Sequence, residues 1–168
     1  VTLPVRIVEG NVTAISTRGD YVLFRDANGS LLGFGDMGSG KLGRDPKGVS
    51  HRPILVYEGN VTSFAAGFNH SAMVLEDGSL WSFGRNEYGQ LGDANLSNQI
   101  VPVRVVDANV TEVATGDHHT LFLKADGSVW SMGRNINGQL GDGNQTNRFQ
   151  PIKIIGSNAT RIACGNDY

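Results

Sequence analysis

The sequence predicts an all-β protein that forms part of a β-propeller, in which four-stranded antiparallel blades stack face to face. One block of residues recurs along the 168-residue chain with a period of 49. Each period contains short runs of β-branched and aromatic residues separated by glycine, asparagine and aspartate. No stretch of helical length shows the 3.6-residue apolar period of an amphipathic helix. Each repeat is therefore a block of strands that buries its faces against its neighbours.

The period is marked most clearly by proline. Pro4, Pro53, Pro102 and Pro151 are equally spaced, and residues 126–142 match residues 77–93 at thirteen of seventeen positions. We treat residues 1–168 as a single repeat domain with units 4–52, 53–101 and 102–150 and a partial unit 151–168. The sequence therefore predicts three full blades and part of a fourth.

The third unit shows the strands that we expect in each blade. Runs 103–106, 110–115, 120–124 and 128–132 each read as a strand of about five residues. We expect these four runs to form one antiparallel meander, with the Asp-Gly pair at 126–127 as the turn between the third and fourth strands. Both faces of the later strands are apolar, which indicates a sheet covered on both sides by neighbouring blades.

Composition excludes several classes of protein. A net charge of −2, a pI near 6.1 and scattered lysines and arginines give no basic stripe for nucleic acid. A single cysteine, Cys164, allows no intrachain disulfide and no cysteine-based zinc site, and we expect it to be a buried core thiol. No apolar run is long enough to predict membrane insertion. Because the first residue is Val1, we expect that a leader has been removed or that the sequence is a piece of a longer chain.

Two segments share the motif G-R-N-x-x-G-Q-L-G-D, at residues 84–93 and 133–142. They are preceded by the runs A-A-G-F-N-H-S-A-M-V-L and A-T-G-D-H-H-T-L-F-L. This combination resembles the regulator of chromosome condensation repeat family. The resemblance implies a β-propeller, typically of seven blades. Seven units would need about 340 residues. The chain then corresponds to a fragment of the ring, whose remaining blades come from the same chain or from another chain. The first unit departs from the pattern at Arg18, Tyr21, Leu32 and Asp36.

The residues that recur in the units are interpreted as structural. The glycines follow a strand but open no helix and lack the lysine of a phosphate-binding loop, so they indicate turns of positive φ and close passage between blades. The histidines have no recurring nucleophile or carboxylate beside them, and tyrosine (Tyr21, Tyr168) replaces them in other units, which favours hydrogen bonds between blades over general-base catalysis. We therefore predict no catalytic residue, no metal site and no cofactor. The structural set is Gly84, Gly89, Gly92, Gly133, Gly138, Gly141, His70, His119, Trp81 and Trp130.

Arg85 and Arg134 recur at blade spacing, as do Asp93 and Asp142. They could line a ligand-binding ring or form structural ion pairs between loops, and we favour the ion pairs.

Eight N-x-S/T triplets occur, at Asn11, Asn28, Asn60, Asn69, Asn95, Asn109, Asn144 and Asn158. They have two interpretations. Asn and Thr suit turns and strand starts, and the same triplets are acceptors for N-glycosylation. Glycosylation at Asn11, Asn60, Asn95, Asn109, Asn144 and Asn158 would place the chain outside the cell or at its surface; the alternative is a cytoplasmic protein.

The leading functional hypothesis is a non-catalytic binding or scaffold module, part of a larger secreted or cell-surface protein, that contacts a protein partner through the loops that vary most between units. The expected contact residues are Asn95, Asn98, Gln99, Asn144, Gln145, Asn147 and Arg148. The resemblance implies one alternative, guanine-nucleotide exchange on a small GTPase. The exposed ends of the array suggest another, a self-assembling surface scaffold.

Overall fold

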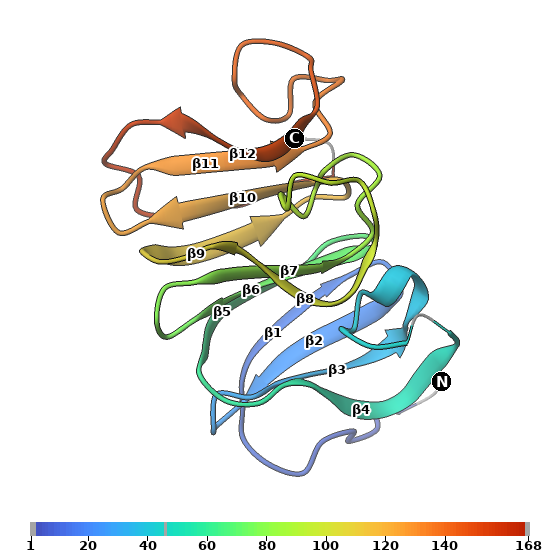
Figure 1. Cartoon of the computed structure of the whole chain (residues 1–168). Coiled ribbons are helices and arrows are strands. Elements are labelled where there is room, and N and C mark those ends of the chain that lie inside the picture. Colours follow the sequence, from blue (N-terminus) through green and yellow to red (C-terminus); the bar gives the residue numbers. More distant parts are fainter. Residues whose placement is uncertain (1–2, 46, 167–168) are drawn as a thin grey trace.

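The computed structural model describes residues 3–45 and 47–166, which form three four-stranded antiparallel sheets (Figure 1). The first sheet contains β1 (Val12–Arg18), β2 (Tyr21–Asp26), β3 (Leu31–Asp36) and β4 (Val49–Tyr57). The second contains β5 (Val61–Ala66), β6 (His70–Leu75), β7 (Leu80–Gly84) and β8 (Gln99–Val106). The third contains β9 (Val110–Thr115), β10 (His119–Lys124), β11 (Val129–Gly133) and β12 (Arg148–Ile155). The only helix in the described part is a short 3-10 turn, η1 (Gly38–Gly40).

The blades are offset from the proline-marked units. The prediction that runs 103–106 and 110–132 share one sheet is wrong, because residues 103–106 lie in β8, which pairs with β7 of the second sheet. After the long loop that follows β7, the chain returns along its own blade and crosses to the next blade only at residues 107–109. The described part of the last unit after β12, residues 156–166, contains no strand.

This offset explains the recurring prolines. Pro53, Pro102 and Pro151 all lie in the last strand of a sheet, one edge of which has no partner strand in the described part of the chain. Proline cannot donate a hydrogen bond from its nitrogen, so it is tolerated at such an edge and discourages pairing with another strand there. The outer edge of each blade is therefore poorly suited to edge-to-edge assembly.

Apolar side chains fill the space between adjacent blades. One cluster joins the first and second sheets and includes Leu23, Met73 and Phe83; a second joins the second and third sheets and includes Val74, Phe122 and Met132. Trp81 packs against the first cluster and Trp130 against the second. The sheets are thus covered on both faces, as their sequence predicts.

The two ends of the strands form two rims. At one, which we call the loop rim, lie the turns 18–20, 67–69 and 116–118 and the long loops 37–48, 85–98 and 134–147. At the other, the hairpin rim, lie the turns 27–30, 76–79 and 125–128 and the connections between blades at 58–60 and 107–109. Because neighbouring strands are antiparallel, every second connection falls at the same rim.

The recurring N-x-T triplets have a structural role at the hairpin rim. Asn60, Asn109 and Asn158 adopt positive φ angles of 60°, 68° and 71°, a conformation that asparagine tolerates better than most residues. The threonine that follows lies at an irregularity in strand pairing, where Thr62 Oγ1 donates to the carbonyl of Val74 (3.2 Å) and Thr111 Oγ1 to that of Leu123 (3.3 Å). The fold thus accounts for the recurrence of these triplets.

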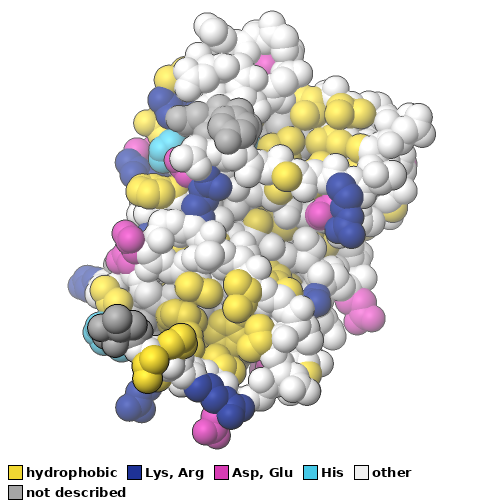
Figure 2. Space-filling view, turned by 180° about the vertical axis from the view of Figure 1, so that it is seen from behind, with side chains coloured by type: hydrophobic (Ala, Val, Ile, Leu, Met, Phe, Trp, Pro, Cys, Tyr) yellow, Lys and Arg dark blue, Asp and Glu magenta, His cyan; other side chains and the backbone are white. Residues whose placement is uncertain are grey.

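No blade within residues 3–45 and 47–166 covers the outer face of the first blade. Exposed apolar side chains of the N-terminal segment and β1 include Leu3, Val5, Ile7 and Ile15, and Figure 2 shows an apolar area in the lower half of the molecule, where this blade lies. Cys164 near the other end is half-buried, and burial raises the pKa of its thiol to about 12. Within residues 3–45 and 47–166, the model contains no helix with the length and apolarity needed to cross a membrane.

Candidate functional site

Hydrogen bonds at the loop rim join one blade to the next. His70 Nε2 lies 3.0 Å from Thr120 Oγ1 of the third blade, and Thr120 Oγ1 donates to the carbonyl of Gln90 in the second (2.8 Å). In the first blade Tyr21 replaces histidine, and its hydroxyl donates to the carbonyl of His70 (2.7 Å). These buried contacts hold neighbouring blades in register. Tyr168, at the equivalent position in the last unit, lies outside the described residues.

Glycine makes room for each imidazole. A Cβ at Gly67 would lie 2.5 Å from Cε1 of His70, and a Cβ at Gly116 would overlap His119. Both histidines are fully buried, and the loss of hydration on burial lowers the pKa of His70 to about 3. His70 is therefore neutral at physiological pH.

An asparagine at the start of each of the two later loops organises the loop around itself. Asn135 is fully buried; its Nδ2 donates to Asp142 Oδ1 (2.8 Å), and its Oδ1 accepts the backbone N–H of Leu140 (3.0 Å). Asn86 makes the same bonds to Asp93 Oδ1 (2.8 Å) and the N–H of Leu91 (3.0 Å). These networks give loops 85–98 and 134–147 one defined conformation.

Most residues predicted to contact a partner belong to these networks. Asn98 Oδ1 accepts the N–H of Asn86 (3.0 Å), and Asn147 Oδ1 accepts that of Asn135 (2.8 Å). Gln99, Asn95, Asn144 and Arg148 donate to the carboxylates of Asp93 or Asp142. Gln145 is exposed at the loop surface. The polar side chains therefore serve largely to shape the loops, although Asn95 and Asn144 are themselves exposed.

Two of the recurring charged residues, Arg85 and Asp142, form ion pairs with side chains that do not belong to the recurring set. Arg85 pairs with Glu87 (2.5 Å), and Asp142 pairs with Arg148 (2.6 Å), which sets the pKa of the Asp142 carboxyl below its usual value against the opposing effect of burial. The guanidinium of Arg134 lies over the ring of Tyr88, 5.5 Å from its centroid. Arg85 thus pairs within its own loop, and Asp142 pairs with the first residue of β12.

The structure reveals a feature of the loop rim that the sequence interpretation missed. The rings of Phe68 and His118 are 6.5 Å apart and those of His118 and Tyr88 are 5.2 Å apart, so side chains of two blades touch. Gly89, next to Tyr88, lies against Phe149 of the third blade. Phe68 is 45% exposed and Phe149 is 43% exposed. We call Phe68, His118, Tyr88 and Phe149 the aromatic row. The sequence offered one signal for it, a phenylalanine, Phe68, in the turn 67–69.

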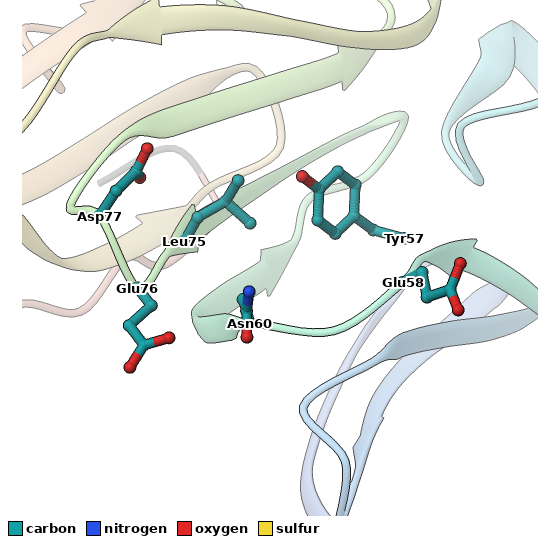
Figure 3. A pocket seen from close by; sticks show the side chains of 6 residues that line it. All are labelled: Tyr57, Glu58, Asn60, Leu75, Glu76 and Asp77. Carbon is teal, nitrogen blue, oxygen red and sulfur yellow. The ribbon is translucent and has the colours of Figure 1, made fainter.

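A hollow of about 460 Å³ at the hairpin rim is lined by Tyr57, Glu58, Asn60, Leu75, Glu76 and Asp77 (Figure 3). A hollow at the equivalent place in the next blade is lined by Asn109, Lys124, Ala125 and Asp126. Because it recurs with different charges, this hollow is a product of blade stacking. Among residues 3–45 and 47–166, no group of three or more His, Cys, Asp or Glu side chains is placed to hold a metal ion.

Comparison with protein families identifies the repeat. The model of the regulator of chromosome condensation (RCC1) repeat matches residues 77–123 and 126–168, more than half of the chain, and a second RCC1 repeat model matches residues 61–90 and 110–139. The chain belongs to the RCC1 repeat family. The expected family is thereby confirmed. Comparison with curated protein sequences found no significant match.

Solved structures confirm the propeller fold of this RCC1-repeat chain. Human WBSCR16 superposes with a TM-score of 0.83 at 24% identity, covering 94% of this chain and 43% of that one. Yeast RCC1 (Prp20), in its complex with Kap60, gives a TM-score of 0.79 at 24% identity, covering 98% and 42%. A second structure of Prp20p from Saccharomyces cerevisiae, described together with its binding to Gsp1p and histones, gives 0.79 at 24%, covering 96% and 43%. The chain thus spans less than half the length of these structures.

Proposed function

We propose that this RCC1-repeat chain is a non-catalytic protein-interaction module that binds its partner at the loop rim, with the aromatic row as the anchor. The observation that carries the proposal is that Phe68, His118 and Tyr88 touch across two blades. Aromatic side chains contribute a large contact area at little cost in conformational entropy, and they are enriched at the energetic centres of interfaces.

The surrounding loops support this function. The networks around Asn86 and Asn135 fix the loops before any partner arrives, so binding need not order them. The yeast relative Prp20 has been solved with a protein bound to it, which is consistent with a propeller of this family acting as a binding surface.

Capture of partners by the chain and by two matched variants tests the proposal. Phe68→Ser with Phe149→Ser removes the exposed ends of the aromatic row, whereas Leu55→Ser with Ile155→Ser removes exposed apolar side chains on the outer strands. We expect partners that bind the unmodified chain and the second variant to be lost from the first. Equal retention by both variants, with both folded by circular dichroism, would contradict the proposal.

Guanine-nucleotide exchange is the competing function. Exchange requires remodelling of a GTPase nucleotide site by a protruding element, and the three sequence units have equal length, with no insertion. We therefore predict no acceleration of labelled GDP release from a panel of small GTPases. Acceleration that depends on the loop rim would replace our proposal with this one.

A secreted or cell-surface setting, with glycans on the exposed triplets, is a separate hypothesis. The structural role of Asn60, Asn109 and Asn158 accounts for three of the eight triplets without glycosylation. Intact mass of the protein isolated from its native source tests it, because each glycan adds to the mass of the chain.

A further inference from the structure

The loop of the first blade, residues 37–48, differs in chemistry from its two equivalents. Met37 stands where Asn86 and Asn135 anchor the other loops, and Arg44 stands where Asp93 and Asp142 accept their hydrogen bonds. Both members of the internal network are thus replaced together. Arg44 is exposed, whereas the Asp142 side chain is only 8% exposed.

The replacement leaves a basic surface. Segment 44–52 carries three cations, Arg44, Lys47 and Arg52, against one carboxylate, Asp45, a net charge of +2. The equivalent segment 93–101 has one carboxylate and no cation, and segment 142–150 has one of each, so their net charges are −1 and 0. Of the three equivalent segments, only that of the first blade therefore has a net positive charge.

These cations remain available to a ligand. Arg44, Lys47 and Arg52 are exposed, and none of them makes an ion pair within the described part of the chain. Asp45 Oδ1 accepts the backbone N–H of Lys47 (3.2 Å).

Other cations of the loop rim are already neutralised. Arg18 pairs with Asp117 (2.6 Å), Lys41 with Asp36 (2.5 Å) and Arg85 with Glu87 (2.5 Å). The exposed cations of the rim are therefore concentrated in the first blade.

We propose that Arg44, Lys47 and Arg52 form a docking surface for an acidic segment of the protein partner. This inference rests on the proposed function, because the surface and the aromatic row share the loop rim. Charge complementarity decides the kind of partner. Val49, 54% exposed between Lys47 and Arg52, adds an apolar contact that suits a peptide.

A phosphate backbone fits this surface less well than a peptide. The chain has a net charge of −2, and Asp20, an exposed carboxylate of the same rim, would repel an extended polyanion. Two cations in loop 37–48 and a third near the start of β4 match a short acidic stretch.

The test uses fluorescence anisotropy of a labelled oligo-glutamate peptide with the full chain. We expect binding that weakens as salt is added. Arg44→Glu with Arg52→Glu should weaken binding about tenfold or more, because attraction becomes repulsion. Arg104→Glu with Lys153→Glu, on exposed positions of β8 and β12, is the matched control and should bind as the unmodified chain does. Both variants change the net charge from −2 to −6.

Several outcomes would overturn the proposal. They are absence of binding at low salt, an equal loss in the control variant, or tighter binding of a short DNA duplex of the same charge that is lost in the first variant. If charge reversal unfolds the chain, the neutral variant Lys47→Gln with Arg52→Gln replaces it in the test, and this variant should also weaken peptide binding. The variant Phe68→Ser with Phe149→Ser should still bind the oligo-glutamate peptide. A failure of the proposed function at the aromatic row can therefore be distinguished from a failure of the basic surface.

Discussion

One position of the repeat is occupied by a buried histidine in two blades and by a tyrosine in the first, and each side chain has different hydrogen-bond partners. His70 reaches a hydroxyl of the next blade, whereas Tyr21 at the same position reaches a backbone carbonyl and the hydroxyl of Ser71 (2.8 Å). The longer phenol occurs in the blade that has Arg18 in place of the glycine that accommodates imidazole. The glycine and the histidine of the later units are thus replaced together in the first blade.

Stability should depend on the protonation of His70. Burial, reinforced by repulsion from His119, His118 and Arg18, lowers its pKa from the usual 6.5 to about 3. Between these values the unfolded chain binds a proton that the folded chain excludes, so stability present above about pH 6.5 is lost as pH falls toward 3. The contribution is up to about 1.4 kcal/mol per pH unit.

Urea unfolding at a series of pH values measures this contribution. His70→Asn should lower stability at neutral pH but show a shallower decline on acidification than the unmodified chain. The exposed His51→Asn should leave the decline unchanged. Parallel declines in the unmodified chain and in His70→Asn would show that His70 does not titrate on unfolding.

At the scale of the element, the long loops of the second and third blades are ordered by one side chain each. Asn135 Nδ2 donates to Asp142 Oδ1 and to the carbonyls of Asn144 (3.1 Å) and Thr146 (3.1 Å). A loop without regular secondary structure thereby gains a defined shape. The shape in turn determines which apolar side chains are presented at the rim.

Asn135→Ala should therefore open loop 134–147 more than it unfolds the blade. Removing the amide leaves buried partners unsatisfied and should cost about 1–3 kcal/mol of unfolding free energy. Hydrogen–deuterium exchange should rise in this loop and remain low in β10 and β11. The exposed Asn137→Ala is the control, and exchange that rises equally in both variants would contradict the assignment.

At the scale of the whole molecule, one side chain connects blades that are not adjacent in sequence. Arg18 Nε of the first blade lies 2.6 Å from Asp117 Oδ1 of the third, and its guanidinium also donates to Asn166 Oδ1. The first blade, which lacks the glycine of the other units, is thus tied to the far end of the array.

A double-mutant cycle with Arg18→Gln and Asp117→Asn measures this connection. Both side chains are partly exposed, 19% and 24%, so we expect a modest coupling energy of about 0.5–1 kcal/mol that shrinks in high salt. The exposed pair Arg104 and Asp107, 3.4 Å apart, should give a coupling near zero. Equal coupling energies in the two cycles would show that Arg18 has no special role in joining the blades.

The sequence alone determined the repeat, its family and the all-β blade architecture, because these depend on local properties that recur. Asp77-Gly78 specifies a tight hairpin wherever it occurs, and alternating apolar residues specify a strand. Leu42, Leu91 and Leu140, spaced by the period, are all fully buried. Recurrence made such signals reliable.

Only the tertiary structure decided where each blade begins and which loop residues face outward. A periodic sequence has no intrinsic starting point, so the strand that carries Pro102 could belong to either neighbouring sheet until its pairing with β7 was known. The direction of Asn98 and Asn147 was likewise undetermined, because a polar side chain in a loop can satisfy its hydrogen bonds with water, with a partner or with the backbone of its own loop. The aromatic row depends on contacts between blades, which no single repeat contains.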